Sequence, residues 1–384
     1  MTKRFRRRSR IGVWSPERES EMRRLIPLIL LLNCLPVMAG PTQSCAVAED
    51  NSASAPVQEH RVTAAVLERL QSDRTFTVRA AAAQLREAAA DDDALNEVVG
   101  HLRWAIRNSD GEPRATAYDI LEAMSLGGRA DVAEQFIAGI EDVQQHVRQA
   151  SAMGLRMAPS GKRDAAGTAV FDRLGREADP DVYHSLLDSL TVLASPTHKS
   201  RVDELRKVLS MEQPAGMVPD HWAQWRVPDH FEEWKFKAAR AVINVIGPAD
   251  AIALFRDLDV AKPGERFAIE GAVRALAVYA MEHFTPEMDP GRRDGLRDLL
   301  RDYGVPLLSQ ESAEEAERDA RVRSAVVTKL FPVVLGRPEF WRPGDVDQIR
   351  SVLVAALPKE RDGSKVAGEI NRLLSLLDSG GRRS

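Results

Sequence analysis

The sequence predicts an all-α protein in which pairs of helices stack into a right-handed α-α superhelix. Aromatic residues make up only 5% of the 384-residue chain. Ala, Leu, Arg, Asp and Glu are abundant, and their unbranched or short side chains suit helices better than strands. A short motif also returns with a period near 34 residues, which is the length of one helix pair in helical-repeat proteins. Asn-Gly dipeptides, typical of β-hairpins, are absent.

The repeated motif starts with a β-branched residue, continues with a charged residue and has Ala three positions after its start. We call the first residue of each copy its anchor. The clearest copies begin at Val78, Val147, Ile269 and Val322, and weaker copies begin at Pro113, Val182 and Phe236. Successive anchors are 35, 34, 35, 54, 33 and 53 residues apart. The spacing therefore predicts about seven helix pairs, interrupted twice by some 20 extra residues.

Each copy has the apolar spacing of an amphipathic helix. Val78, Ala82, Leu85 and Ala89 follow one another at i, i+4, i+7 and i+11, so they share one helical stripe. Acidic and turn-forming residues precede the anchors, such as Asp179 before Val182, and Asp at a helix start accepts backbone N–H bonds. Apolar segments at Leu95–Ile106, Val132–Ile140 and Val170–Leu174 are expected to be the first helices of the following pairs.

The pattern Asp-x-x-Val-Arg-x-x-Ala, present once per helix pair, resembles the HEAT-like repeats of the armadillo superfamily, particularly the short bacterial type. The resemblance covers about residues 60–335 and is best in the copies at Val78 and Val147. It implies a solenoid, over residues 60–342, with a long curved surface lined by one helix of each pair. Such a surface suits a protein partner, so a non-enzymatic scaffold is the leading expectation.

Several segments interrupt or flank this array. Insertions are expected near residues 210–232 and 282–318, where Pro and Gly gather. Residues 343–378 are interpreted as two closing helices, because the terminal units of a repeat array differ from the inner ones. Residues 49–59 are expected to form a flexible lead-in, and residues 379–384 a disordered tail.

Residues 1–48 are interpreted as a signal peptide. Arg23 and Arg24 precede an apolar run that ends near Met38, and Ala46-Val47-Ala48 is a suitable cleavage site. Met22 is an alternative start of the chain. We therefore expect an exported protein, periplasmic or extracellular, without stable membrane insertion after cleavage. A lipid anchor at Cys45 and an uncleaved tether at residues 25–38 remain alternatives.

Charge and cysteine usage limit the possible partners. Residues 1–48 hold nine basic and three acidic residues, so the rest of the chain has 44 basic against 54 acidic residues. This acidic balance disfavours a nucleic-acid partner. Both cysteines, Cys34 and Cys45, lie in the predicted leader. The mature chain would then have no disulfide and no thiolate metal site.

No catalytic, cofactor or metal motif was found in the sequence. Phosphate-binding glycine loops, His-Glu-x-x-His and Gly-x-Ser-x-Gly are all absent. We therefore expect no enzyme activity and no cofactor. The alternative is an enzyme or accessory factor with a site built from the two insertions, since some bacterial HEAT-like proteins are associated with lyase-type bilin attachment.

The first insertion carries the candidate binding residues. Trp222, Trp225 and Trp234 are three of the six Trp residues in the chain, and they lie within 13 positions beside His221 and His230. Because Trp is enriched at interface hot spots, this cluster is a hypothetical partner-binding patch. The competing interpretation is that these rings pack an irregular loop onto the solenoid. A metal pair of His221 with His230 lacks a third ligand nearby.

Overall fold

The computed structural model describes residues 77–89, 92–212, 227–259, 262–285, 287–308, 320–336, 342–360 and 363–380. Within these ranges the chain is all-helical and has no strand, which confirms the predicted all-α class. The predicted leader and lead-in, residues 1–59, lie outside the described residues.

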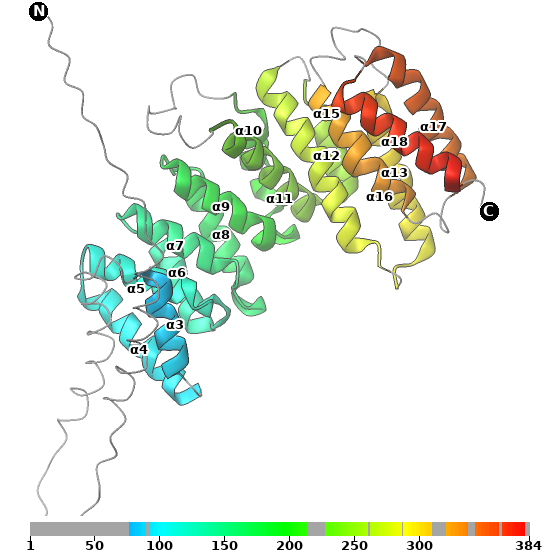
Figure 1. The fold of residues 1–384 in the computed structure, drawn as a ribbon. Coiled ribbons are helices and arrows are strands. Elements are labelled where there is room, and N and C mark those ends of the chain that lie inside the picture. The colour runs from blue at the N-terminus through cyan, green and yellow to red at the C-terminus, as the bar shows by residue number, and fades with distance from the viewer. Residues whose placement is uncertain are drawn as a thin grey trace, which may run out of the picture. The chain divides into compact units, whose positions relative to one another are not determined.

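The anchors all lie on helices that pack in chain order. We call these helices the anchor row. Each contacts the next in the row, and neighbouring members lie side by side in Figure 1. The row consists of α3 (Val78–Ala88), α5 (Glu112–Ala123), α7 (Gln145–Leu155), α9 (Pro180–Leu193), α11 (Val227–Arg256), α12 (Pro263–His283), α15 (Ala320–Ala325) and α18 (Lys365–Gly380). Helix α15 continues through a π-helical turn, η5 (Val326–Leu330), into α16 (Phe331–Leu335).

A second set of helices packs against the anchor row. Each of these helices contacts the anchor helix that follows it in the chain. They are α4 (Asp92–Asn108), α6 (Ala130–Gly139), α8 (Arg163–Leu174), α10 (Val202–Ser210), α13 (Pro290–Leu308) and α17 (Pro343–Ala356). The apolar segments proposed from the sequence as first helices of each pair coincide with α4, α6 and α8.

The two long gaps between anchors contain regular helices as well as loops. In the first gap, α10 ends at Ser210 and α11 already begins at Val227, and residues 213–226 lie outside the described residues. In the second gap, α13 packs against α15, α16 and α17, with Leu296, Leu300 and Leu308 buried. Much of the range 282–318 is thus a packed helix.

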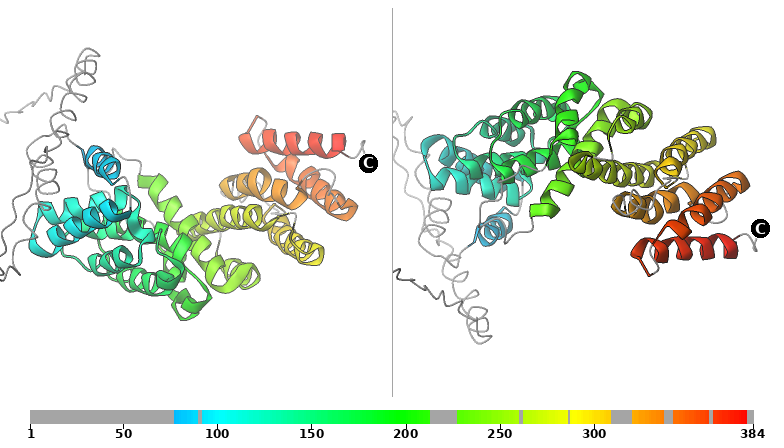
Figure 2. Two further views of the ribbon diagram at one scale, coloured as in Figure 1. Left: turned by 90° about the horizontal axis from the view of Figure 1, so that it is seen from below. Right: turned by 90° about the horizontal axis from the view of Figure 1, so that it is seen from above.

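Helix α18 belongs to the anchor row, although no anchor was recognised in its sequence. It contacts both α15 and α17, and these helices lie side by side in Figure 2. Val366, Ile370, Leu373 and Leu377 are buried at the i, i+4, i+7 and i+11 spacing of the other copies. Its remaining surface is largely polar, which suits the end of an array.

Helix α11 is broken at Gly247, where the backbone has φ +81° and ψ 164°. Only glycine adopts this region readily, and Pro248 restarts the helix because its missing N–H is not needed in a first turn. The stretch Phe231–Arg256 is long and apolar enough to cross a membrane by length and composition. Its contacts with α9, α10 and α12 account for that apolar character, because half of its most apolar window is buried in the fold.

Ion pairs join one copy of the repeat to the next. In three copies the basic residue directly after the anchor reaches an acidic residue that lies just before the following helix of the row. Arg114 on α5 pairs with Asp142 at 3.2 Å, Arg148 on α7 with Glu177 at 2.8 Å, and Arg323 on α15 with Glu360 at 2.8 Å. The motif's charged position therefore serves packing between copies.

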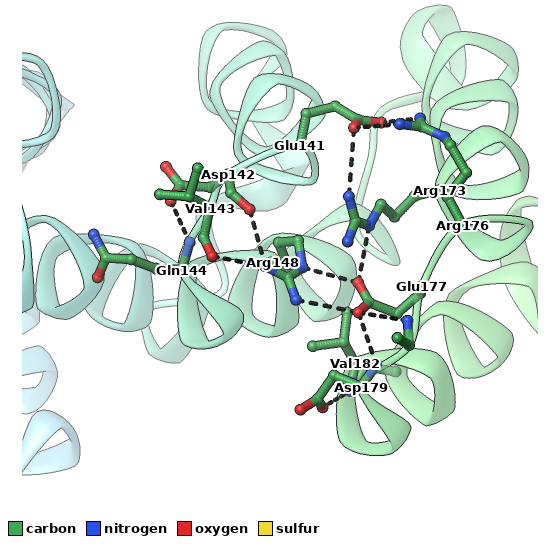
Figure 3. Close-up of polar contacts among 12 residues, drawn as sticks. Glu141, Asp142, Val143, Gln144, Arg148, Arg173, Arg176, Glu177, Asp179 and Val182 are labelled. Carbon is green, nitrogen blue, oxygen red and sulfur yellow. Dashed lines mark hydrogen bonds and ion pairs between the residues drawn. The ribbon is translucent and has the colours of Figure 1, made fainter.

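The Arg148–Glu177 pair shows how this contact works (Figure 3). Arg148 donates two bonds to Glu177 and two more to the backbone oxygens of Asp142 and Val143, each at 3.0 Å. Glu177 also accepts a bond from Arg173 and from the backbone N–H of Asp179. The result is a fixed link from α7 to the start of α9.

Asp179, two residues after Glu177, caps the N-terminus of α9. Its carboxylate accepts the backbone N–H bonds of Asp181 and Val182. The Arg148 and Arg173 guanidinium groups and the backbone donors overcome the opposing effect of burial and lower the pKa of Glu177 to about 2. The glutamate side chain is only 1% exposed. The pair is therefore charged across the physiological range and shielded from solvent.

Replacing Glu177 with Gln should lower the free energy of unfolding by about 3 kcal/mol at pH 7, because Arg148 would be left buried without a counter-charge. The folded-state pKa lies below the unfolded value of 4.5. The stabilisation is therefore complete above pH 4.5 and is lost as the pH falls towards 2. Urea unfolding of both proteins at several pH values between 2 and 7 measures this.

The matched control is Glu141→Gln, because Glu141 pairs with Arg173 and Arg176 but is 44% exposed. Its cost should be about 0.5 kcal/mol or less. A difference between wild type and Glu177→Gln that stays constant from pH 7 to pH 2 would contradict the electrostatic role.

Candidate functional site

The structure describes only part of the sequence-predicted Trp and His patch. Trp222, Trp225 and His221 lie outside the described residues. His230 lies in the first turn of α11, and its side chain is outside the description. Trp234 is described, on α11, and is half-buried. The patch as a partner-binding site therefore stays a prediction.

Trp234 belongs to a string of aromatic rings that crosses three anchor helices. Its ring centroid lies 4.9 Å from that of Tyr183 on α9 and 6.4 Å from that of Phe231 on α11. Phe231 in turn meets Phe267 on α12 edge-on at 5.9 Å. Rings at these separations attract one another beyond the simple burial of area. The string therefore holds α9, α11 and α12 together.

Burial has a clear effect on the polar atoms of this string. It raises the pKa of Tyr183 to about 12, so this phenol stays neutral. The indole N–H of Trp234 is buried and has no hydrogen-bond partner among the described residues. An exposed interface Trp would normally keep that group available to water or to a partner. In this geometry the Trp234 ring packs between helices.

Charged groups surround the far end of the string. The Arg321 guanidinium lies 5.4 Å from the Phe267 ring centroid and pairs with Glu232 on α11. Burial raises the pKa of Glu270 on α12, against the lowering effect of Arg274. These contacts tie α15 to α11 and α12.

A second surface, missed in the sequence, lies on the outward side of α7 and α9. Met153, Met157 and Val192 are 38%, 53% and 40% exposed. Met153 lies in the last turn of α7, and Arg156 and Met157 form the turn that directly follows it. Val192 lies four residues after Asp188 on α9. We call Met153, Met157 and Val192 the apolar face.

Charges beside the apolar face are paired with one another. Arg156 contacts Asp188 at 2.5 Å, linking α7 to α9. Lys237 on α11 lies 2.9 Å from Asp188 and 2.8 Å from Nε2 of His184. The ion pairs fix neighbouring anchor helices in register. These charged groups next to the apolar face therefore neutralise one another.

No sequence pattern marks the apolar face. The tenth residue after the anchor is apolar in four successive copies, as Met157, Val192, Ile246 and Tyr279. The helical period puts this position beside the motif's buried Ala, at the edge of the buried stripe. Ile246 and Tyr279 accordingly pack against the core, whereas Met157 and Val192 are exposed.

One cluster has the residue types of a hydrolytic triad but a different arrangement. Ser195 Oγ lies 3.1 Å from His198 Nδ1 and 3.2 Å from Asp164 Oδ1. His198 Nε2 lies 3.2 Å from the backbone oxygen of Asp164. In a triad the carboxylate orients the imidazole, whereas here it bonds the serine. Ser195 and His198 form a capping box at the turn η3 (Pro196–Arg201), which accounts for their positions.

The described residues contain no group of three or more His, Cys, Asp and Glu side chains that could hold a metal ion. A scan against protein-family models and a search of curated proteins found no match to the sequence.

Replacing Trp234 with Ala should destabilise the fold by about 2 kcal/mol, because it removes the ring between Tyr183 and Phe231. Trp104 on α4 is the matched control, since it is 46% exposed. Trp104→Ala should change the free energy of unfolding by about 0.5 kcal/mol or less. Denaturant unfolding of the two variants measures the difference. Equal small effects would show that Trp234 is not a packing residue.

Proposed function

We propose that this chain is a non-enzymatic, HEAT-like scaffold that binds a protein partner through the apolar face of α7 and α9. The array would consist of about seven helix pairs in a right-handed superhelix. The observation that carries the proposal is the exposure of Met153 on α7, Met157 in the turn that follows it and Val192 on the adjacent helix α9.

The kind of partner follows from the chemistry of that face. Methionine is flexible and polarisable, and it is enriched at protein interfaces. The neighbouring charges of Arg156, Asp188 and Lys237 are already paired, so a partner has no large charge to match. Together with the acidic balance of residues 49–384, this favours a protein with an apolar contact surface over a nucleic acid.

The Trp and His residues near the start of α11 are a second candidate surface. The packing of Trp234 between Tyr183 and Phe231 favours a structural role for that residue. Trp222, Trp225, His221 and His230 keep their predicted role in partner binding. The alternative remains an enzyme or accessory factor with a site built from the two insertions. The Ser195, His198 and Asp164 cluster lies outside the insertions and is arranged as a helix cap, so it does not support that alternative.

The apolar face can be tested by photocrosslinking in the native host. A benzoyl-phenylalanine placed at Met153 or Met157 should crosslink to the same protein. The matched control is Val354 on α17, which is 56% exposed but lies outside the apolar face. Met153→Glu combined with Met157→Glu should reduce capture of that protein at least tenfold while leaving the helical circular dichroism unchanged. Equal crosslinking from position 354, or full capture by the double variant, would contradict the proposal.

We further propose that the protein works outside the cytoplasm, on the strength of the leader pattern in residues 1–48. The mature protein should then begin at Glu49 and appear in the exported fraction. N-terminal sequencing of the protein from each cell fraction checks this. A mature chain that retains residues 25–38 would contradict cleavage and favour the tethered alternative.

A further inference from the structure

Asp119 on α5 is a half-buried carboxylate that the fold does not neutralise. Within the part of the chain that the structure describes, its side chain has no ion pair and no hydrogen bond. Burial raises the pKa of Asp119 to about 6, while His146 on α7 opposes this effect and Glu122 on α5 adds to it. The carboxylate is therefore charged at neutral pH, although it is incompletely hydrated and lacks a counter-charge.

Asp119 bounds the apolar face on the side away from α9. Asp119 and Met153 are each six residues after the anchor of their copy, on α5 and α7, which pack against each other. Three residues further along the chain from each of them lie Glu122 and Arg156. Burial raises the pKa of Glu122 and Arg156 opposes it, so these two side chains approach one another across the helix contact. The register of α5 against α7 thus places Asp119 beside Met153.

The copy on α9 shows how the fold satisfies a carboxylate at this position. Asp188 is likewise six residues after its anchor. One of its oxygens contacts Arg156 at 2.5 Å and the other contacts Lys237 at 2.9 Å, so each neighbouring helix supplies one cation. Asp119 receives no such contact from the described residues of α3 or α7. It therefore has the capacity to accept a cation from outside the fold.

We infer that the partner is a polypeptide segment that places an apolar side chain on Met153 and Met157 and a Lys or Arg side chain against Asp119. This inference rests on the proposed function, because it uses the same apolar face. The partner's cation would give Asp119 the counter-charge that Asp188 receives within the fold. The apolar stem of a Lys or Arg side chain can lie along Met153 while its charged end reaches the carboxylate. An anionic surface would be repelled at this position.

The stability of the free chain tests whether Asp119 lacks a counter-charge. Asp119→Asn should raise the Tm by about 2 °C at pH 7, because it removes a half-buried, unneutralised charge. The folded-state pKa lies above the unfolded value of 3.8, so this gain should shrink as the pH falls from 6 to 3.8. Asp188→Asn is the matched control at the same position and should lower the Tm, since Asp188 has two ion pairs. An unchanged or lower Tm in Asp119→Asn contradicts the inference.

Hexylammonium, which joins an apolar tail to one positive charge, is a defined probe of the site, and hexanoate is its anionic counterpart. In the mature chain labelled with ε-¹³C-methionine, hexylammonium should shift the Met153 and Met157 methyl signals about fivefold more than hexanoate at the same concentration. The exposed Met281 on α12 is the internal reference. Asp119→Asn should remove the difference between the probes, whereas Asp110→Asn, at a 97% exposed acidic residue just before α5, should keep it. Equal shifts in the wild type, or a difference that persists in Asp119→Asn, overturn the cationic contact.

The native partner provides the last test. Asp119→Lys should reduce crosslinking from position 153 roughly tenfold, whereas Asp110→Lys should not. A Lys or Arg of the crosslinked segment, when changed to Glu, should restore binding to Asp119→Lys. Full capture by Asp119→Lys, together with loss of capture in the Met153→Glu and Met157→Glu double variant, would refute the cationic contact and keep the proposed function. Failure of positions 153 and 157 to crosslink would refute the proposed function, while the Tm and probe measurements still decide the role of Asp119.

Discussion

The arrangement of the helices depends on buried ion pairs that run from one copy of the repeat to the next. Apolar side chains alone allow neighbouring helices to slide or rotate, because the hydrophobic effect has no direction. The bidentate contact of Arg148 with Glu177 has one productive geometry, and Glu177 also bonds the backbone at the start of α9. The pair therefore sets the register of α7 against α9. The same kind of contact joins other copies, through Arg114 with Asp142 and Arg323 with Glu360.

This register determines what the outward side of the anchor row presents. With α7 and α9 fixed, Arg156 meets Asp188, and Asp188 also meets Lys237 from α11. Charges that could attract a polyanion are thereby satisfied within the fold. Met153, Met157 and Val192 remain in solvent beside them. A surface with exposed, adaptable apolar groups and paired charges is suited to recognition by shape and apolar contact.

The region around α11 is held together by aromatic packing and by the hydrogen bonds of a buried lysine. The aromatic string through Tyr183, Trp234 and Phe231 joins α9 to α11, while Lys235 on the same turn of α11 bonds the end of α10. A buried lysine is costly unless its donors are satisfied. The three carbonyls that satisfy it belong to Val208 and Leu209 in the last turn of α10 and to Met211 directly after that helix. Packing and capping therefore depend on each other at this junction.

The sequence by itself determined the all-α class, the helical setting of the anchors and the apolar segments of α4, α6 and α8, because helical periodicity is a local property of the chain. It did not predict α13, which lies in the range interpreted as the second insertion. Only the tertiary structure decided that Arg148 meets Glu177, that α18 joins the anchor row, that Trp234 packs against Tyr183 and that Lys235 is buried. The physical reason is that periodicity fixes the side of a helix on which a residue lies, whereas its partner depends on how separate helices approach one another.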